Sequence, residues 1–171
     1  MSSVEERLAA LETKVRLLED QHEIRQLVCS YGPAVDIADN LEKSRKLASL
    51  WSEDGIYDVD PFGRPQGREE IAHFFEGLHF EMVPQGCAHI MSAPYIRITG
   101  DTAVALAYSC VFRPDGEQFL VWRVASNEWN LVRKDGRWQV AERINRLMRG
   151  SEQARGLFNS IHDLIAKADT L

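Results

Sequence analysis

Residues 119–149, FLVWRVASNEWNLVRKDGRWQVAERINRLMR, decide the fold class. Two long runs rich in β-branched and aromatic residues flank Asp135-Gly136, the dipeptide typical of a tight hairpin turn. The pattern therefore predicts two long antiparallel strands, one on each side of this turn.

More strands are predicted upstream of this hairpin. Residues 88–98, AHIMSAPYIRI, and residues 102–112, TAVALAYSCVF, are separated by Gly100-Asp101, which predicts another hairpin. The turn signal Pro-Asp-Gly at 114–116 leads into the strand that follows. A short strand is expected in WSEDGIYDVD, residues 51–60, with Asp54-Gly55 as a break.

The remaining segments predict helices at about 1–22, 23–38, 41–50, 67–80 and 151–168. Pro33 is expected to kink or interrupt the second of these near its end. The first helix carries a heptad-like apolar stripe, which consists of Val4, Leu8, Leu11, Val15 and Leu18. The stripe is too short for an independent coiled coil, and it fits packing either on its own domain or on a neighbouring subunit.

Helices followed by an antiparallel meander indicate an α+β fold rather than a parallel sheet. A long curved meander packed by helices on one side makes a cone with an interior. The open end of such a cone is a common site for small molecules. We expect an N-terminal amphipathic helix at 1–22, an α+β cone domain at 23–150 and a C-terminal helix at 151–171.

Composition limits the function classes. The chain has 171 residues and a net charge of −6, which disfavours a nucleic-acid partner. It contains no run of 18 apolar residues that would predict a membrane span, and its charged N-terminus is unlike a signal peptide. Cys29, Cys87 and Cys110 are odd in number and widely spaced, so we expect buried free thiols in a reducing cytoplasm.

Three polar residues stand out because their chemistry fits together. The carboxylate of Asp36 can orient the imidazole of His89, which can then take a proton, and Arg143 can hold a developing anion. Tyr31, five residues before Asp36, can donate a hydrogen bond to a substrate. Arg143 lies five residues after Trp138, so a bulge or strong curvature is needed to turn both side chains inward.

Other residues are weaker candidates for the pocket wall, namely Tyr57, Tyr108, Trp51, Trp129 and Arg146. His22, His73 and His79 are expected to face water. No pair of histidines and acids has a convincing metal-ligand spacing, and no phosphate loop or dinucleotide fingerprint is present. We therefore expect neither a metal nor a cofactor.

The order of several motifs resembles the SnoaL-like branch of the nuclear transport factor 2-like superfamily, which adopts an α+β cone. These motifs are IRQLVCSYGPAVDIAD, LASLWSEDGIYDV, QGREEIAHFFEGL, CAHIMSAPYIRITGDTAVALAY and NEWNLVRKDGRWQVAERIN, within residues 23–149. Within that superfamily the chain looks most like the scytalone dehydratase, hexachlorocyclohexane dehydrochlorinase and bile acid dehydratase group.

The resemblance implies roles for particular residues. Asp36 and His89 fall at the positions of the group's Asp and His, and Tyr31 matches a tyrosine of the bile acid dehydratases, where the dehydrochlorinase has Lys. Arg143 matches an arginine of the dehydrochlorinase. Arg146 is the alternative candidate for the arginine of the site, because the bile acid enzymes place their arginine slightly later in the sequence.

These expectations favour a cofactor-independent lyase that dehydrates a small hydroxylated cyclic, aromatic or steroid-like compound. A non-catalytic binding protein is the first alternative, in which Asp36 and His89 would lie too far apart or point out of the cavity. A cyclase or ketosteroid-isomerase-like enzyme with a carboxylate base is the second, with Asp58 or Asp60 as that base. The family resemblance also implies a homotrimer, or alternatively a homodimer, and no nucleic-acid or membrane partner.

Overall fold

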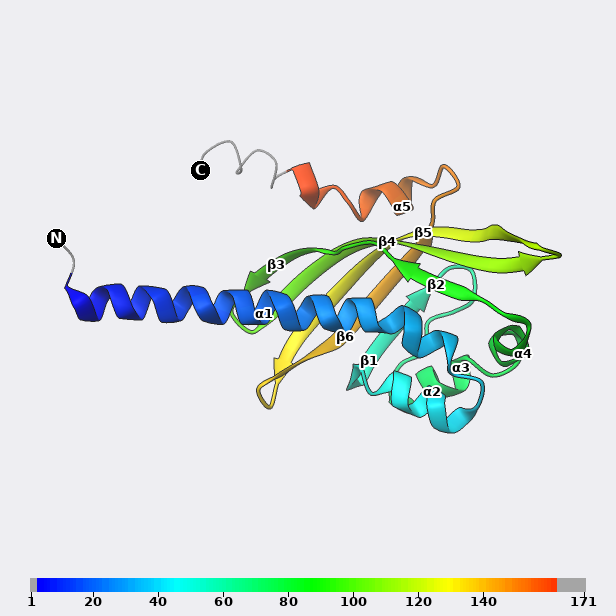
Figure 1. The fold of residues 1–171 in the computed structure, drawn as a ribbon, viewed down its shortest axis with the longest axis horizontal. Helices are drawn as coiled ribbons and strands as arrows, with labels where there is room; N and C mark the ends of the chain where they lie inside the picture. Colours follow the sequence, from blue (N-terminus) through cyan, green and yellow to red (C-terminus); the bar gives the residue numbers. More distant parts are fainter. Residues whose placement is uncertain (1–2, 163–171) are drawn as a thin grey trace.

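The computed structural model describes residues 3–162, which form a curved, unclosed sheet with the N-terminal helices packed against one face (Figure 1). This arrangement confirms the predicted α+β class. The elements in chain order are α1 Val4–Asp36, α2 Leu41–Ala48, β1 Trp51–Val59, α3 Arg68–Phe74, α4 Leu78–Gln85, β2 Ala88–Met91, β3 Tyr95–Thr99, β4 Thr102–Asp115, β5 Gln118–Lys134, β6 Arg137–Leu147 and α5 Glu152–Gly156.

The sheet has the order β1-β6-β5-β4-β2, and β3 also pairs with β4. The predicted meander is present, but β1 joins it parallel to β6. The single strand expected at 88–98 is divided into β2 and β3, with Pro94 between them, and each pairs antiparallel with a different part of β4. Asp54-Gly55 lies inside β1, where the register with β6 shifts between Trp51 and Ile56.

The two helices expected at 1–22 and 23–38 form one continuous helix, α1, of 33 residues. Ser3 and Glu6 form a capping box at its start, which satisfies backbone donors of the first turn. Pro33 lies within α1 and does not interrupt it, because the helix continues to Asp36. The first half of α1 projects beyond the body of the protein (Figure 1).

Other helix boundaries also differ from the prediction. The helix expected at 67–80 is broken at Gly77, whose φ of 75° suits glycine, so that α3 and α4 are separate. The helix expected at 151–168 begins as α5, capped by Ser151, and residues 163–171 lie outside the described part of the chain. None of the described helices is long and apolar enough to cross a membrane.

The cysteines are free thiols, but the predicted burial is wrong for Cys29, which is exposed on α1. Cys87 and Cys110 are only partly buried.

A bulge in β6 brings Trp138 and Arg143 to the same side of the sheet. Asn130 pairs with Glu142 and Leu131 pairs with Val140, so Ala141 has no partner on β5. This extra residue reverses the alternation of side chains. Trp138 and Arg143 are consequently both buried, with exposed fractions of 3% and 2%.

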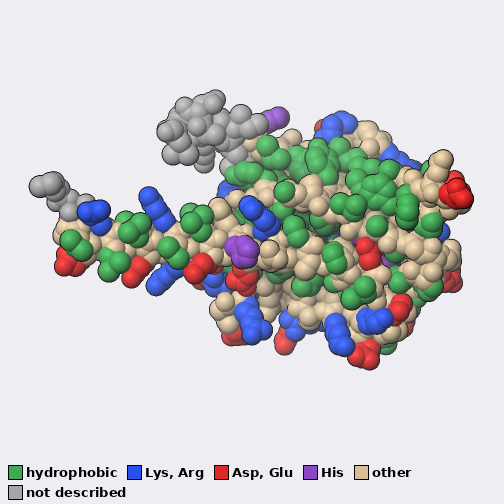
Figure 2. Space-filling view, viewed as in Figure 1, with side chains coloured by type: hydrophobic (Ala, Val, Ile, Leu, Met, Phe, Trp, Pro, Cys, Tyr) green, Lys and Arg blue, Asp and Glu red, His purple; other side chains and the backbone are tan. Residues whose placement is uncertain are grey.

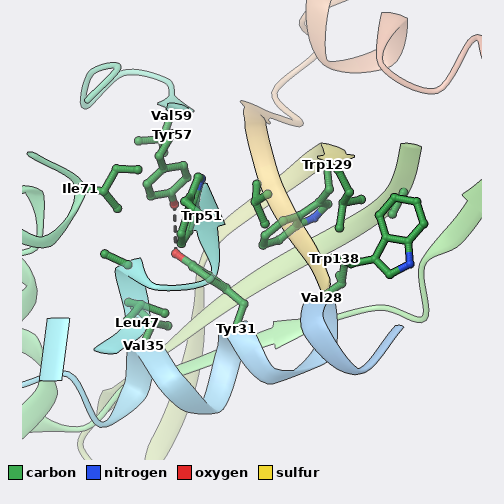
Figure 3. Close-up of a cluster of buried hydrophobic side chains, with 14 of the residues drawn as sticks. Val28, Tyr31, Val35, Leu47, Trp51, Tyr57, Val59, Ile71, Trp129 and Trp138 are labelled. Atoms are coloured by element: carbon green, nitrogen blue, oxygen red, sulfur yellow. Dashed lines mark hydrogen bonds between the residues drawn. The ribbon is translucent and has the colours of Figure 1, made fainter. Parts of the chain in front are cut away.

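The core lies between α1 and the inner face of the sheet (Figure 3). Trp51 and Trp129 are fully buried there, and the edge of the Tyr31 ring packs against both. Burial of aromatic rings of this size is the main stabilising contribution available to a domain of this length. The same packing fixes the orientation of α1 over the strands.

Asp20 joins α1 to the β5–β6 hairpin. Its carboxylate accepts hydrogen bonds from Arg133 Nη2 at 2.6 Å and from Trp138 Nε1 at 3.1 Å. The Arg133 hydrogen bond holds the pKa of Asp20 below its ordinary value of 3.8.

Asp20→Asn is therefore expected to lower the free energy of unfolding by about 1 kcal/mol at pH 7. A carboxyl with a depressed pKa stabilises the fold above its unfolded pKa, and this contribution disappears as pH falls through the folded value. The difference from the parent protein should shrink below about pH 4. Urea unfolding from pH 7 to pH 3 tests this, with Asp115→Asn at an exposed turn as the control.

Candidate functional site

A cavity of about 300 Å³ lies between the helices and the inner face of the sheet. Most of its wall is aromatic or aliphatic, and its polar groups come from α1, the connection between α3 and α4, α4, β1, β2 and the long strands. This mixture of apolar wall and few polar groups is typical of small-molecule sites. The polar and ionisable side chains that line it are Tyr31, Tyr57, Glu76, His79, His89, Ser109, Arg123, Arg143 and Asn145.

Asp36 and His89 meet at the edge of this cavity. Asp36 Oδ1 lies 2.6 Å from His89 Nδ1, and the carboxylate also accepts the backbone N–H of His89 at 2.9 Å. The side chains are 23% and 15% exposed. The carboxylate selects the tautomer with a proton on Nδ1, so Nε2 is the nitrogen left to accept a proton.

Gly32 makes this contact possible. A Cβ atom at this position would lie 2.1 Å from the backbone oxygen of His89. Any side chain would therefore hold α1 away from β2. Because Asp36 follows Gly32 by one helical turn on the same side of α1, the close approach also brings its carboxylate to His89.

Tyr31 and Tyr57 form a buried hydroxyl pair. Their oxygens are 3.0 Å apart, and either one can be the donor (Figure 3). Burial is the main cause that raises the pKa of Tyr31. The Tyr31 hydroxyl is therefore a neutral hydrogen-bond donor or acceptor at the cavity wall rather than a source of phenolate.

Arg143 is held in the floor of the cavity by neutral partners. Its Nε and Nη2 donate to Asn127 Oδ1 at 3.1 and 2.8 Å, and its Nη1 lies 3.4 Å from the Tyr57 hydroxyl. The guanidinium also stacks on the rings of Tyr31 and Trp129, with distances of 3.9 and 4.2 Å to the centroids. These contacts keep a buried cation in place.

Arg123 is a second cation at the cavity, and the sequence analysis did not identify it. Arg123 pairs with Val111 and Phe112 pairs with Val121, so Trp122 is the extra residue of a bulge in β5. Trp122 and Arg123 both line the cavity as a result. Strict alternation along the strand would not predict this, and the bulge has no local sequence signal of its own.

Comparison with known proteins agrees with this architecture. A family model described as SnoaL-like domain matches residues 16–144. The chain belongs to the SnoaL-like family. Members of this NTF2-like family include polyketide cyclases, isomerases and dehydratases.

Solved structures extend the comparison of this SnoaL-like domain. An NTF2-like protein with a cystatin-like fold from Novosphingobium aromaticivorans is 38% identical, with a TM-score of 0.83 over 89% of this chain and 97% of that chain. A "Putative Scytalone Dehydratase" from the same organism is 19% identical, with a TM-score of 0.63 over 80% and 88% of the two chains. At the lower identity the likeness shows the fold alone. A comparison with curated proteins gives no match.

Several predicted wall residues of the SnoaL-like cone lie elsewhere. Trp51 and Trp129 are in the core behind the cavity rather than in its lining. Tyr108 is wrong as a pocket residue, because it is 48% exposed and its ring packs on Phe158. Arg146 is also outside the lining, since both of its terminal nitrogens bind the Asp58 carboxylate, at 2.7 and 2.8 Å.

His79 was expected to face water, but it lines the cavity from α4. Its Nε2 donates to the backbone oxygen of Val35 at 2.9 Å, and its ring centroid is 5.8 Å from that of His89. Burial lowers the pKa of His79. The neutral form with a proton on Nε2 fits these contacts. His22 and His73 are exposed, as predicted.

Asp36, Cys87 and His89 also form a group in which the potential metal ligands lie within 4.8 Å of one another. The Cys87 thiol contacts Asp36 Oδ1 at 3.7 Å, and burial raises the pKa of the thiol to about 11. A cation here would have to replace the proton between Asp36 and His89. Metal binding and the hydrogen-bonded dyad are therefore mutually exclusive uses of this group.

Gly32→Ala is expected to lower the free energy of unfolding by about 1–3 kcal/mol, the usual cost of overpacking, and to separate Asp36 from His89. Chemical denaturation checks the first effect, and the shift of the His89 Nδ1 proton in NMR spectra checks the second. Gly156→Ala is the matched control, because nothing lies within 4 Å of the added Cβ. Parent-like stability of Gly32→Ala would contradict the close approach.

Proposed function

We propose that this protein is a cofactor-independent lyase that dehydrates small hydroxylated cyclic, aromatic or steroid-like compounds. The observation that carries the proposal is the 2.6 Å contact between Asp36 Oδ1 and His89 Nδ1 at the edge of a mostly apolar cavity. A base held by a carboxylate beside bound substrate is the minimum that proton abstraction requires.

His89 Nε2 takes a proton from a carbon next to a substrate carbonyl, and the C–H electron pair becomes the new double bond. Asp36 stabilises the imidazolium that forms. The imidazolium then gives the proton to the departing hydroxyl, so water leaves and His89 returns to its neutral form. No external oxidant or reductant is required.

Tyr31 and Arg143 act on the oxygen atoms of the substrate. The Tyr31–Tyr57 hydroxyl pair donates a hydrogen bond to the carbonyl or to the departing hydroxyl. Arg143 stabilises the negative charge that develops on the enolate oxygen, because it is a fixed and buried cation at the cavity. Dehydrohalogenation and a shift of a double bond need the same groups.

Two alternatives are less well supported. A binding protein without chemistry predicts that Asp36 and His89 lie too far apart or point out of the cavity, whereas the two side chains are in contact and His89 lines the cavity. An isomerase with a carboxylate base needs an acid in the cavity. Among the acidic residues of 3–162 only Glu76 lines the cavity, and it is paired with His73 at 3.1 Å, whereas Asp58 is bound by Arg146.

The predicted cytoplasmic location stays a prediction.

His89→Ala and Asp36→Asn are expected to lower kcat by about 10² to 10⁴, the usual contribution of general-base catalysis. A panel of hydroxylated cyclic ketones and steroids, followed by the absorbance of the conjugated enone, provides the assay. His22→Ala, at an exposed position of α1, is the control for loss of an imidazole. Turnover that His89→Ala leaves unchanged would exclude the dyad, and a parent protein inactive on the whole panel would favour the binding alternative.

A further inference from the structure

Arg123 has hydrogen-bond donors to spare at the cavity. Its Nη2 donates to the backbone oxygen of Asp60 and to Asn145 Oδ1. A guanidinium has five N–H donors. Within residues 3–162, neither Nε nor Nη1 of Arg123 makes a hydrogen bond, which leaves three N–H groups for a ligand.

The two cavity arginines also lack acidic partners. No carboxylate among residues 3–162 lies within 4.0 Å of the guanidinium of Arg123 or of Arg143, although Arg64, Arg133 and Arg146 all have one. Asn145 links the pair instead: it accepts from Arg123 and donates at 2.8 Å to Asn127, which holds Arg143. Cations withdrawn from water without an anion are costly to maintain, and an anionic ligand would offset that cost.

The sheet register gives the position of Arg123 relative to the base. His89 pairs with Val111 on β4, and Val111 pairs with Arg123 on β5. These residues form one row across three strands, so the backbones of His89 and Arg123 are about 10 Å apart, or two strand spacings. Because the guanidinium of Arg123 reaches Asn145 on β6, away from β2, a compound of one or two rings is needed to extend from it to His89.

We infer that Arg123 anchors a carboxylate of the substrate, which is then a one- or two-ring carboxylic acid. This inference deepens the proposed function, because it leaves Arg143 for the charge that develops in the reaction. A planar carboxylate fits because a guanidinium can bind both of its oxygens. The apolar remainder of the cavity, which includes Phe62, Trp122 and Met91, surrounds the rings.

The test compares naphthalene-2-carboxylate with its carboxamide, which has nearly the same shape and no charge. Titration of tryptophan fluorescence, or calorimetry, measures the dissociation constants. The parent protein is expected to bind the carboxylate about tenfold or more tightly than the amide, the gain typical of one charge-assisted pair. Arg123→Met should abolish this preference and leave amide binding unchanged.

Arg97→Met, on the exposed side of β3, removes the same charge away from the cavity and should keep the preference. Equal affinities of the parent protein for the two compounds would overturn the inference, even if Arg123→Met failed to fold. Binding of the carboxylate by His89→Ala separates this inference from the proposed reaction, since the anchor needs no base. A preference for the carboxylate without turnover would support Arg123 and contradict only the lyase.

A second inference rests independently on the projecting part of α1. Its apolar stripe is exposed, with exposed fractions from 50% at Val15 to 75% at Val4. In heptad notation Leu8 and Val15 occupy a positions, and Val4, Leu11 and Leu18 occupy d positions. Figure 2 shows hydrophobic side chains along the projection, interspersed with charged ones.

The charged residues that flank the stripe are basic on one side and acidic on the other. Both charged g positions are basic, Arg7 and Lys14, and the e positions are acidic, Glu5, Glu12 and Glu19. In a parallel pair of helices g residues face the e residues of the next heptad, so that Arg7 meets Glu12 and Lys14 meets Glu19 of the other copy. An antiparallel pair would place like charges together.

We propose that the projecting half of α1 associates in parallel with the same segment of a second copy of this chain. The stripe covers about two heptads, which is short for a coiled coil alone, so the bodies must also contribute contacts. Exposed apolar residues of the sheet offer such surface, among them Ile90, Tyr108, Val121 and Val124. Figure 2 shows hydrophobic side chains gathered on the body as well.

Glu12→Lys combined with Glu19→Lys should weaken self-association about tenfold or more, because four attractive pairs become repulsive. Adding Arg7→Glu and Lys14→Glu should restore it. Sedimentation equilibrium of the full chain measures both, with Glu53→Lys plus Glu117→Lys as the charge-matched control. A monomeric parent protein, or a failed rescue, would overturn the proposal.

The orientation has its own test. Leu11→Cys in a Cys29→Ser background should form a covalent dimer on oxidation, because equivalent d positions face each other in a parallel pair. Arg16→Cys, on the outer side of the helix, should not. Cross-linking of both or of neither would contradict a parallel arrangement.

Discussion

The close approach of α1 to β2 at Gly32 is the constraint on which the rest of the site depends. It requires the absence of a side chain, since a Cβ would lie 2.1 Å from the His89 oxygen. One helical turn later the Asp36 carboxylate accepts both the backbone and the ring N–H of His89. A steric requirement at one residue therefore sets the geometry of an electrostatic contact at another.

The polar layer behind the cavity is arranged around a single amide oxygen. Asn127 Oδ1 accepts from Arg143 Nε and Nη2 and from Asn145 Nδ2, while Asn127 Nδ2 donates to Ser109 Oγ at 2.9 Å. Such buried networks are useful only when nearly every member has its partners. Apolar residues of similar volume would fill this space at a lower cost of removing polar groups from water. The network is therefore better explained by a role in a ligand site than by a contribution to the stability of the fold.

The sequence was sufficient to predict the α+β class, because strand alternation and the Asp135-Gly136 turn are local signals. It also indicated that Asp36 and His89 would meet, although only through the family resemblance, since a contact between residues 53 positions apart has no local signature. Arg143 was expected to face the interior together with Trp138 only if a bulge or strong curvature interrupted the strand. The bulge at Ala141 provides this interruption. Tyr108 was misplaced because regular alternation along β4 puts it on the outer face, beside Phe158. Arg123 and His79 were missed for a related reason: a bulge and a helix break redirect them, and both depend on tertiary packing.

The end of α1 adds to the electrostatics of the cavity in a way that no single side chain does. The last carbonyls of a helix carry a partial negative charge, and no basic residue occupies the last turn of α1 to neutralise it. Val35 already directs one of these carbonyls at His79, and Asp36 beside it holds His89. In the proposed reaction, the carboxyl end of α1 would therefore act with Asp36 as a diffuse counter-ion for the imidazolium of His89.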